Sequence, residues 1–279
     1  MNEKRLILNA DDFGINFETN EAIEELFERG FVTSTTVMAP CRFAEDAVAR
    51  AKRNGKIKMG LHLTFNSDRF ATCGPLAKNV PSLTDKDGNF YESVAEFARH
   101  AAAREVAAEI YAQYEFVTRR GVALTHADNH MGSLYGLTGV SFMKEVLDFC
   151  APNGLPFRFP KNIEGAKSIM RTDTIPPALA AAHAQAVEYA GARSVNLIDN
   201  LLTNPVPVAD VASYHMLKNI YMDIVRNLRS GVNEIFMHPS KSGLAPVRRW
   251  EYELLADNEL RELIESEGIR LVSWAEAFD

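Results

Sequence analysis

The side chains that could do chemistry in this 279-residue sequence gather in short groups, each placed after an apolar segment. Asp11 and Asp12 follow the apolar residues 6–8, within the run NADDFG at residues 9–14. Because successive side chains of a strand point to opposite faces, one carboxylate can bind a metal ion while the other faces a substrate as a base. A solvated turn or a helix N-cap would also explain an aspartate pair. Gly14 and the position directly after a strand favour the functional interpretation.

A second group, THADNH at residues 125–130, holds His126, Asp128 and His130. Packing alone poorly explains two histidines and an aspartate within five residues. Imidazole and carboxylate groups are suitable ligands for zinc and related divalent ions. One of the three can instead orient a ligand imidazole from behind. A polar loop after a strand is the alternative, and the metal interpretation is favoured over it.

Three further charged or titratable residues interrupt apolar segments. His62, in the run GLHLT, is either a hydrogen-bonded core residue or a metal ligand, and taken alone it favours the core. His238, before Pro239, can protonate a leaving amine or stabilise an oxyanion, or it can cap backbone carbonyls. Arg158 stands between two phenylalanines, and a buried charge needs a partner, for which Asp11 is the predicted candidate.

The elements that position these residues follow a repeated pattern of helix, glycine and strand. A glycine that ends a helix and precedes an apolar, β-branched segment occurs seven times, at Gly30, Gly55, Gly121, Gly154, Gly191, Gly231 and Gly268. The predicted strands cover residues 6–8, 31–38, 57–63, 122–125, 155–159, 194–198, 232–237 and 269–273. Apolar residues at helical spacing between these segments predict helices, for example around residues 106–117, 217–228 and 260–264.

Alternating strands and helices predict a parallel sheet and an α/β fold. Eight such units within 279 residues fit a distorted, TIM-barrel-like (β/α) barrel that forms a single domain over residues 1–279. An open doubly wound sheet is the alternative, but the sequence has no glycine-rich phosphate loop. Residues 64–90 form a long polar insertion, and connections of this length are usually functional; this one is expected to cover the site. In such barrels the active site lies at the carboxyl ends of the strands, where the candidates, Asp199 among them, are expected to meet.

Composition narrows the function classes. Thirty basic and thirty-seven acidic residues give a net charge of −7 without a basic run, which speaks against nucleic acid or an anionic membrane as a partner. The three cysteines, Cys41, Cys73 and Cys150, show no metal-binding spacing and are expected to be reduced thiols. Because no signal peptide or membrane segment is recognisable, a cytoplasmic protein is expected. A homo-oligomer is left open.

These motifs, taken in order, resemble the YdjC-like (ChbG-type) carbohydrate deacetylase family over nearly the whole chain. The matching pieces are NADDFG (9–14), VTSTT (32–36), GLH (60–62), PSL (81–83) with Asp87-Gly88, THADNH (125–130) and MHP (237–239). The resemblance implies a distorted barrel related to other polysaccharide deacetylases, a divalent ion usually given as Mg²⁺, and hydrolysis of N-acetyl groups on amino sugars.

By the same resemblance, Asp12, His62 and His130 would bind the metal and Asp11 would be the general base. His238 would be the acid, by analogy with the wider deacetylase superfamily, and Arg158 would hold Asp11 in place. Two histidines and one carboxylate suit Zn²⁺ or another transition metal better than Mg²⁺, which prefers oxygen ligands.

One departure concerns Gly132, where the family often has a further histidine. Because of this difference, no particular sugar substrate is carried over from the family to this sequence. Two alternatives to an amino-sugar deacetylase stand, of which the absent histidine motivates the second. One is another metal-dependent barrel hydrolase, which acts on a phosphoester or a different amide. The other is a sugar-binding protein that has lost its activity.

Overall fold

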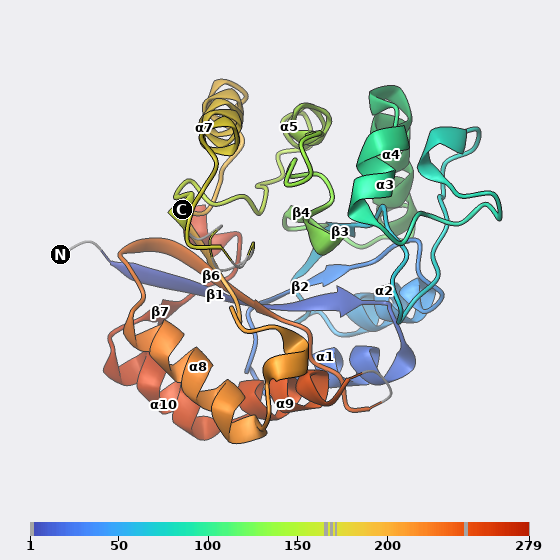
Figure 1. Cartoon of the computed structure of the whole chain (residues 1–279). Helices are drawn as coiled ribbons and strands as arrows, with labels where there is room; N and C mark the ends of the chain where they lie inside the picture. Colours follow the sequence, from blue (N-terminus) through green and yellow to red (C-terminus); the bar gives the residue numbers. More distant parts are fainter. Residues whose placement is uncertain (1–2, 165–166, 168–169, 171, 243–244, 279) are drawn as a thin grey trace.

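One curled parallel sheet organises the chain, for which a computed structural model describes residues 3–164, 167, 170, 172–242 and 245–278. Within those residues the strand order is β4-β3-β2-β1-β6-β5, and β7 pairs with the first part of β1 (Figure 1). The strands are β1 (Lys4–Phe13), β2 (Ser34–Val37), β3 (Met59–Leu63), β4 (Ala127–Asn129), β5 (Asn200–Leu202), β6 (Gly231–Met237) and β7 (Arg270–Leu271). The predicted parallel α/β architecture is confirmed, in the form of a half-barrel.

Isolated residue pairs, rather than strands, span the gap between β4 and β5. Phe157 forms parallel bridges with Ala127 on one side and with Leu197 on the other. The predicted strands 155–159 and 194–198 are therefore wrong. The fourth strand lies at Ala127–Asn129 and shares no residue with the predicted segment 122–125. Proline at positions 156 and 160 supplies no N–H for a ladder, and the Tyr135 hydroxyl donates to the Arg158 carbonyl at 2.6 Å. A regular strand cannot continue there.

Helices surround the sheet and pack against one another as neighbours (Figure 1). They are α1 (Phe17–Glu28), α2 (Ala44–Arg53), α3 (Val94–His100), α4 (Ala103–Thr118), α5 (Met143–Cys150), α7 (Pro177–Ala192), α8 (Tyr214–Arg226), α9 (Pro246–Leu255) and α10 (Asn258–Ser266). Single turns of 3₁₀-helix lie at η1 (Pro81–Leu83), η2 (His130–Gly132), η3 (Val208–Asp210) and η4 (Glu276–Phe278). The helices predicted around residues 106–117, 217–228 and 260–264 correspond to α4, α8 and α10. In the part of the chain that the structure describes, no helix is long and apolar enough to cross a lipid bilayer.

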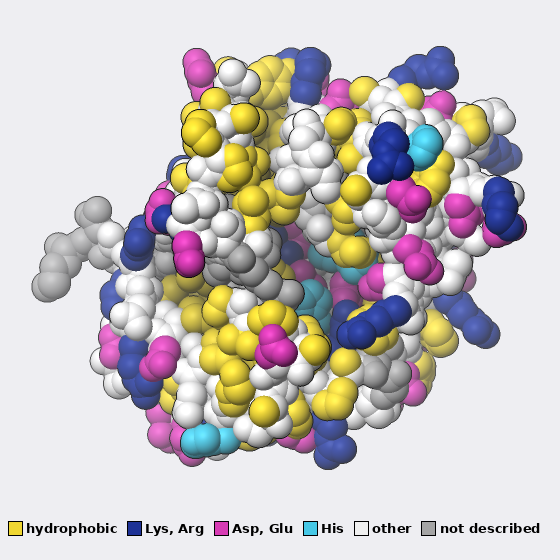
Figure 2. Space-filling view, viewed as in Figure 1, with side chains coloured by type: hydrophobic (Ala, Val, Ile, Leu, Met, Phe, Trp, Pro, Cys, Tyr) yellow, Lys and Arg dark blue, Asp and Glu magenta, His cyan; other side chains and the backbone are white. Residues whose placement is uncertain are grey.

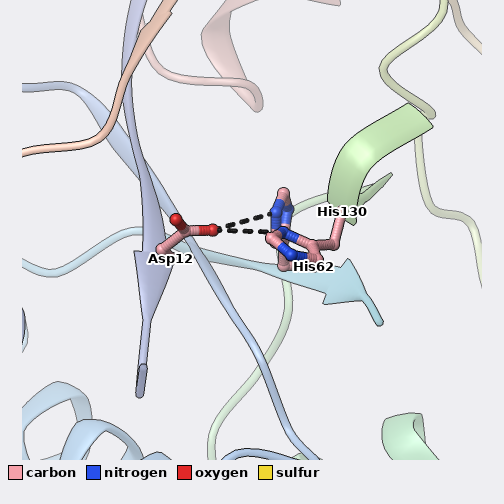
Figure 3. Close-up of side chains that lie close together, drawn as sticks. All are labelled: Asp12, His62 and His130. Carbon is pink, nitrogen blue, oxygen red and sulfur yellow. Dashed lines mark ion pairs between the residues drawn. The ribbon is translucent and has the colours of Figure 1, made fainter. Parts of the chain in front are cut away.

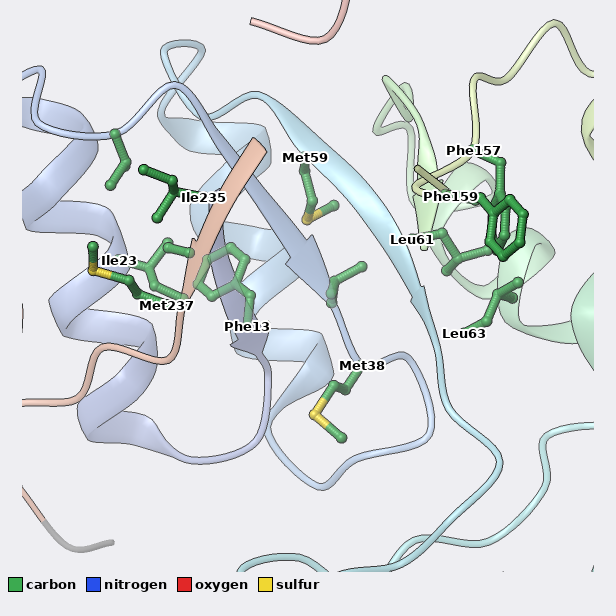
Figure 4. Packing of buried hydrophobic residues seen from close by; sticks show 14 of the residues in the cluster. Phe13, Ile23, Met38, Met59, Leu61, Leu63, Phe157, Phe159, Ile235 and Met237 are labelled. Carbon is green, nitrogen blue, oxygen red and sulfur yellow. The ribbon is translucent and has the colours of Figure 1, made fainter. Parts of the chain in front are cut away.

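The alternation of side chains along β1 divides the core into two parts. Leu6, Leu8 and Ala10 belong to the large cluster between the sheet and the helices. Figure 4 shows part of this cluster, around Phe13 of β1 and Ile23 of α1. Ile7 instead belongs to a small cluster with Trp274 and other residues near β5, β6 and β7. The period of two in the strand thus places Ile7, Asn9 and Asp11 on the inner side of the half-barrel.

The insertion at residues 64–90 is held by α4 and by a disulfide. Glu109 accepts hydrogen bonds from the backbone N–H groups of Leu76 and Ala77 at 3.1 and 2.7 Å. Cys41, in the turn after β2, forms a disulfide with Cys73 of the insertion. The expectation of three reduced thiols is therefore wrong for this pair, while Cys150 is free and buried. The spacing of 32 residues gave no sign of the bond, because the fold alone brings the two Cα atoms within 5.4 Å.

Candidate metal centre

A β-bulge near the end of β1 turns two adjacent carboxylates toward the same cavity. The pairing of β1 with β2 is regular at Asn9 and Ala10 and then shifts before Phe13. Asp12 within the bulge has a φ of 70°, a conformation that residues other than glycine rarely adopt. Asp11 and Asp12 are both buried, and both line a cavity at the carboxyl ends of the strands. The bulge therefore gives both aspartates a place in one site.

The cavity opens as a hollow near the middle of the molecular surface, where histidine and acidic side chains are visible (Figure 2). Asp68, Arg69 and Phe70 of the insertion form part of its wall. The insertion, which was expected to cover the site, thus contributes at least these three residues to the cavity lining. The cavity also includes Gly132, whose φ of +64° and closeness to Tyr135 leave little room for a larger side chain.

Three potential metal ligands converge inside the cavity. Oδ1 of Asp12 lies 3.3 Å from Nε2 of His62 and 3.4 Å from Nδ1 of His130 (Figure 3). This buried Asp12 oxygen accepts no hydrogen bond from any described residue. One carboxylate oxygen and two imidazole nitrogens are a donor set that suits a divalent transition metal. The group could therefore hold a metal ion.

Each of the three side chains has a charged partner on the side away from this cluster. His62 Nδ1 lies 2.6 Å from Oδ1 of Asp128, and Arg248 donates to Oδ2 of Asp12 at 2.7 Å. His130 Nε2 lies 3.3 Å from Oδ2 of Asp68. Such partners fix the orientation of metal ligands and the nitrogen that a histidine presents.

The electrostatics of the cluster favour a cation. Burial alone would lower the pKa of His62, but Asp128 and Asp12 outweigh it and raise the pKa to about 10. Burial alone would also raise the pKa of Asp12, but Arg248 and the two histidines hold it well below its usual value. The negative surroundings that hold a proton on His62 also attract a divalent ion. The proton and the metal ion compete for the same histidine nitrogen.

Asp11, His62 and Asp128 form a second group with metal-ligand spacing, but the guanidinium group of Arg158 pairs with both of its carboxylates. Both guanidinium Nη atoms of Arg158 donate to Asp11, at 2.7 and 2.8 Å, and Nη1 also lies 2.6 Å from Asp128. The predicted pairing of Arg158 with Asp11 is confirmed. Burial alone would raise the pKa of Asp11, but Arg158 lowers it to about 2. Asp11 is therefore ionised at neutral pH and positioned beside the metal cluster.

His238 lies near Asp11 in the lining of the cavity, directly after the end of β6. Its Nε2 lies 4.0 Å from Oδ2 of Asp11, and its Nδ1 lies 3.8 Å from Oε2 of Glu251. The same Glu251 oxygen accepts the backbone N–H of His238 at 2.8 Å. With 32% of its side chain exposed, His238 can reach a molecule in the cavity.

Two candidates from the sequence lie elsewhere. His126 is fully buried, stacks on Trp274 with ring centroids 4.3 Å apart, and does not line the cavity. Burial lowers its pKa well below the usual value, so His126 is a neutral core residue. Asp199 was expected at the carboxyl rim, but it precedes β5 and accepts the N–H of Val232 at the opposite rim. That expectation is wrong, because the strand begins after Asp199 instead of before it.

Sequence reasoning missed four residues that shape the site: Asp68, Glu234, Arg248 and Glu251. Asp68 lies in a polar insertion, while Arg248 and Glu251 lie in a helix with many charged residues. No local pattern separated these residues from the solvated charges around them. Glu234 carried a weak signal, since it interrupts the apolar strand β6 as Arg158 interrupts its own segment.

Comparisons with known proteins find related sequences and structures. A family model described as "YdjC-like protein" matches residues 5–266. The carbohydrate deacetylases of Clostridium beijerinckii and Brevibacillus brevis are 41% and 38% identical over 128 and 127 residues. Each match covers 45% of this chain and 49% or 48% of the relative, so it spans about half the length of these curated relatives.

Solved structures extend the likeness to the whole chain. A proposed cellobiose-phosphate cleavage protein of Enterococcus faecalis V583 is 26% identical, with a TM-score of 0.77 and 98% of both chains covered. A CE4 family pseudoenzyme from Bacillus anthracis has a TM-score of 0.52 at 12% identity, and the match covers all of this chain and 66% of that one. The second likeness concerns the fold alone.

Proposed function

The chain belongs to the YdjC-like protein family, and we propose that it is a metal-dependent hydrolase that removes N-acetyl groups from amino sugars or small oligosaccharides. One observation carries the proposal: the Asp12, His62 and His130 cluster lines one cavity together with an ionised Asp11 and with His238. This arrangement provides a place for a metal ion, a base and an acid around one scissile bond. The names of the curated relatives support the same activity.

Asp12, His62 and His130 would hold the ion through Oδ1, Nε2 and Nδ1 respectively. A bound divalent ion supplies Lewis acidity, which polarises a carbonyl and lowers the pKa of water. Two nitrogen ligands favour Zn²⁺ or another transition metal over Mg²⁺, the ion that the family resemblance implies.

Asp11 would take the proton of the attacking water, because Arg158 keeps its carboxylate ionised and fixed in direction. Arg158 therefore acts through Asp11 rather than on the substrate. His238, which lines the same cavity, would give a proton to the departing amine as the amide C–N bond breaks and acetate forms. The distance of 4.0 Å between His238 Nε2 and Asp11 Oδ2 places the two groups close enough to act on the same amide.

The test is acetate release from N-acetylglucosamine oligomers, measured after chelation and after reconstitution with Mg²⁺, Zn²⁺ or Co²⁺. We expect no release from the chelated protein and the highest rate with a transition metal. Full activity after exhaustive chelation would rule out the metal role.

Asp11→Asn tests the base separately, because asparagine keeps the size of the side chain but cannot accept the water proton. We expect kcat/KM to fall by about 10²- to 10⁴-fold, the range for a lost general base. Metal binding by this variant, measured by calorimetry, is expected to persist. Unchanged turnover in Asp11→Asn contradicts the assignment of the base.

A further inference from the structure

The turn at residues 67–73, called here the Asp68 turn, reaches the metal cluster from the insertion. Within it, Oδ1 of Asp68 accepts the backbone N–H groups of Phe70 and Ala71 at 2.7 and 2.9 Å. The other oxygen, Oδ2, lies 3.3 Å from Nε2 of His130. The turn thus uses one carboxylate oxygen to fold itself and presents the second to a predicted metal ligand.

The contact with His130 decides which ring nitrogen is free. His130 Nδ1 faces Oδ1 of Asp12 at 3.4 Å, and Nε2 points the opposite way, toward Asp68. Nε2 is buried and has no aligned hydrogen-bond partner among the described residues, so Asp68 is the acceptor within reach of a proton there. A neutral imidazole carries one N–H, so a proton held on Nε2 leaves the lone pair of Nδ1 for the metal.

The Asp68 turn is built to hold this position. Ser67 Oγ accepts the N–H of Cys73 at 3.0 Å and donates to its carbonyl at 3.1 Å. The disulfide joins Cys73 to Cys41 beside β2. Phe70 lies against the Arg248 guanidinium, with 4.9 Å between the guanidinium carbon and the ring centroid, and Arg248 holds Asp12. One turn therefore contacts His130 directly and also contacts Arg248, the support of Asp12.

We propose that Asp68 is a positioning residue for His130, so that the insertion completes the metal site. The inference rests on the proposed metal role of Asp12, His62 and His130. Because linkage is reciprocal, metal binding and the folded Asp68 turn stabilise each other. Loss of the second Asp68 oxygen as an acceptor weakens metal binding even where the turn itself remains folded.

Asp68→Asn is the decisive variant, because its side-chain oxygen can still accept from Phe70 and Ala71 while its amide cannot accept the His130 proton. Co²⁺ is titrated into the chelated full-length protein, and the absorption of the bound ion is recorded. Loss of such a partner typically weakens metal affinity by about 10- to 100-fold, and we expect that loss together with a changed Co²⁺ spectrum.

Asp87→Asn is the matched control, because Asp87 lies in the same insertion, is exposed and contacts Lys86. It removes the same charge and should leave the Co²⁺ affinity and spectrum unchanged. Asp68→Ser is the second variant, since serine can also cap the turn but is too short to reach His130. The urea unfolding midpoint of each metal-free Asp68 variant shows whether that variant folds. The Co²⁺ affinity of a variant that folds then tests the inference.

A folded Asp68→Asn or Asp68→Ser protein that binds Co²⁺ within twofold of the wild type, with the same spectrum, overturns the inference. A wild-type protein that binds no Co²⁺ overturns it together with the metal site. A wild-type protein that binds Co²⁺ but releases no acetate contradicts only the deacetylase proposal, because the Co²⁺ titration does not depend on hydrolysis.

Discussion

Two sets of ionisable residues support the candidate metal centre, and they differ in origin. The inner support consists of Arg158 with Asp11, Asp128 and Glu234, all nearly inaccessible and placed by strands or by the bridging segment at Phe157. The outer support consists of Asp68, Arg248 and Glu251, which come from the insertion and from α9. The inner support depends on sheet register, whereas the outer support depends on how peripheral segments fold over the sheet.

The difference shows how one helix can serve two functional groups. Arg248 and Glu251 are three residues apart in α9 and therefore lie on one face. Arg248 holds Asp12, and Glu251 holds the backbone of His238. A shift of α9 would therefore change the metal ligand and the candidate acid together, while the inner support would keep its geometry.

The inner support should be the most sensitive to substitution. Arg158→Met leaves Asp11 and Asp128 buried without their cation, which typically costs about 3–5 kcal/mol of stability. We expect that loss in urea unfolding and no measurable acetate release. Arg193→Met, which removes an exposed arginine that contacts Asp148, is the control and should unfold near the wild-type midpoint. A loss below about 1 kcal/mol for Arg158→Met would mean that the inner support is not required.

Arg248→Met should have the next largest effect. Without the guanidinium, Oδ2 of Asp12 loses its partner and the carboxylate is free to rotate. We expect metal affinity, measured by calorimetry, to fall by about 10- to 100-fold. Arg249→Met is the matched control, since Arg249 is the next residue of α9 but is exposed and contacts Glu253. Equal affinities for the two variants would remove Arg248 from the outer support.

Glu251→Gln is expected to act more weakly and on the rate. Glutamine keeps the side-chain size but loses the charge near His238 and one of the two acceptor oxygens, which serve His238 and Tyr221. We expect kcat for acetate release to fall about tenfold, the equivalent of one hydrogen bond to a charged group, with metal affinity unchanged. Glu253→Gln on the exposed side of α9 is the control. A fall in metal affinity instead of kcat would show that α9 as a whole had moved.

Glu234→Gln should have the smallest effect in acid and reveal itself through pH. Burial raises the pKa of Glu234 to about 8, although Arg158 opposes the shift. The folded protein therefore keeps a proton that the unfolded chain releases near the ordinary glutamate pKa of 4.5. The free energy of unfolding of the wild type therefore decreases between about pH 4.5 and pH 8, where the folded state binds more protons at Glu234 than the unfolded state. Glutamine does not titrate, so urea midpoints should be similar at pH 5 and favour the variant at pH 8. If the difference between the wild-type and variant urea midpoints is the same at pH 5 and pH 8, Glu234 is not protonated in the folded protein.

Sequence patterns determined the local features of this protein. Alternation along β1 holds for Ile7 against Leu6 and Leu8, and the buried charge of Arg158 predicted its partner Asp11. At Asp11 and Asp12 the bulge overrides the predicted alternation and directs both carboxylates to one cavity. The placement of polar side chains after predicted strands indicated one rim, and the family resemblance implied Asp12, His62 and His130 as metal ligands, which the structure brings together. The alternation and the Arg158 pairing depend on backbone period and on the cost of an unpaired buried charge, both of which can be inferred from residue order.

The tertiary structure decided which distant residues support those ligands. Arg248 and Asp12 are 236 positions apart, and Cys41 meets Cys73 only because the insertion folds back beside β2. His126 and His130 look alike in the sequence, yet His126 packs on Trp274 and His130 faces Asp12. Residue type sets what a side chain can do. Which partner it meets depends on packing between segments that sequence separation does not specify, and this packing separates a core histidine from a candidate ligand.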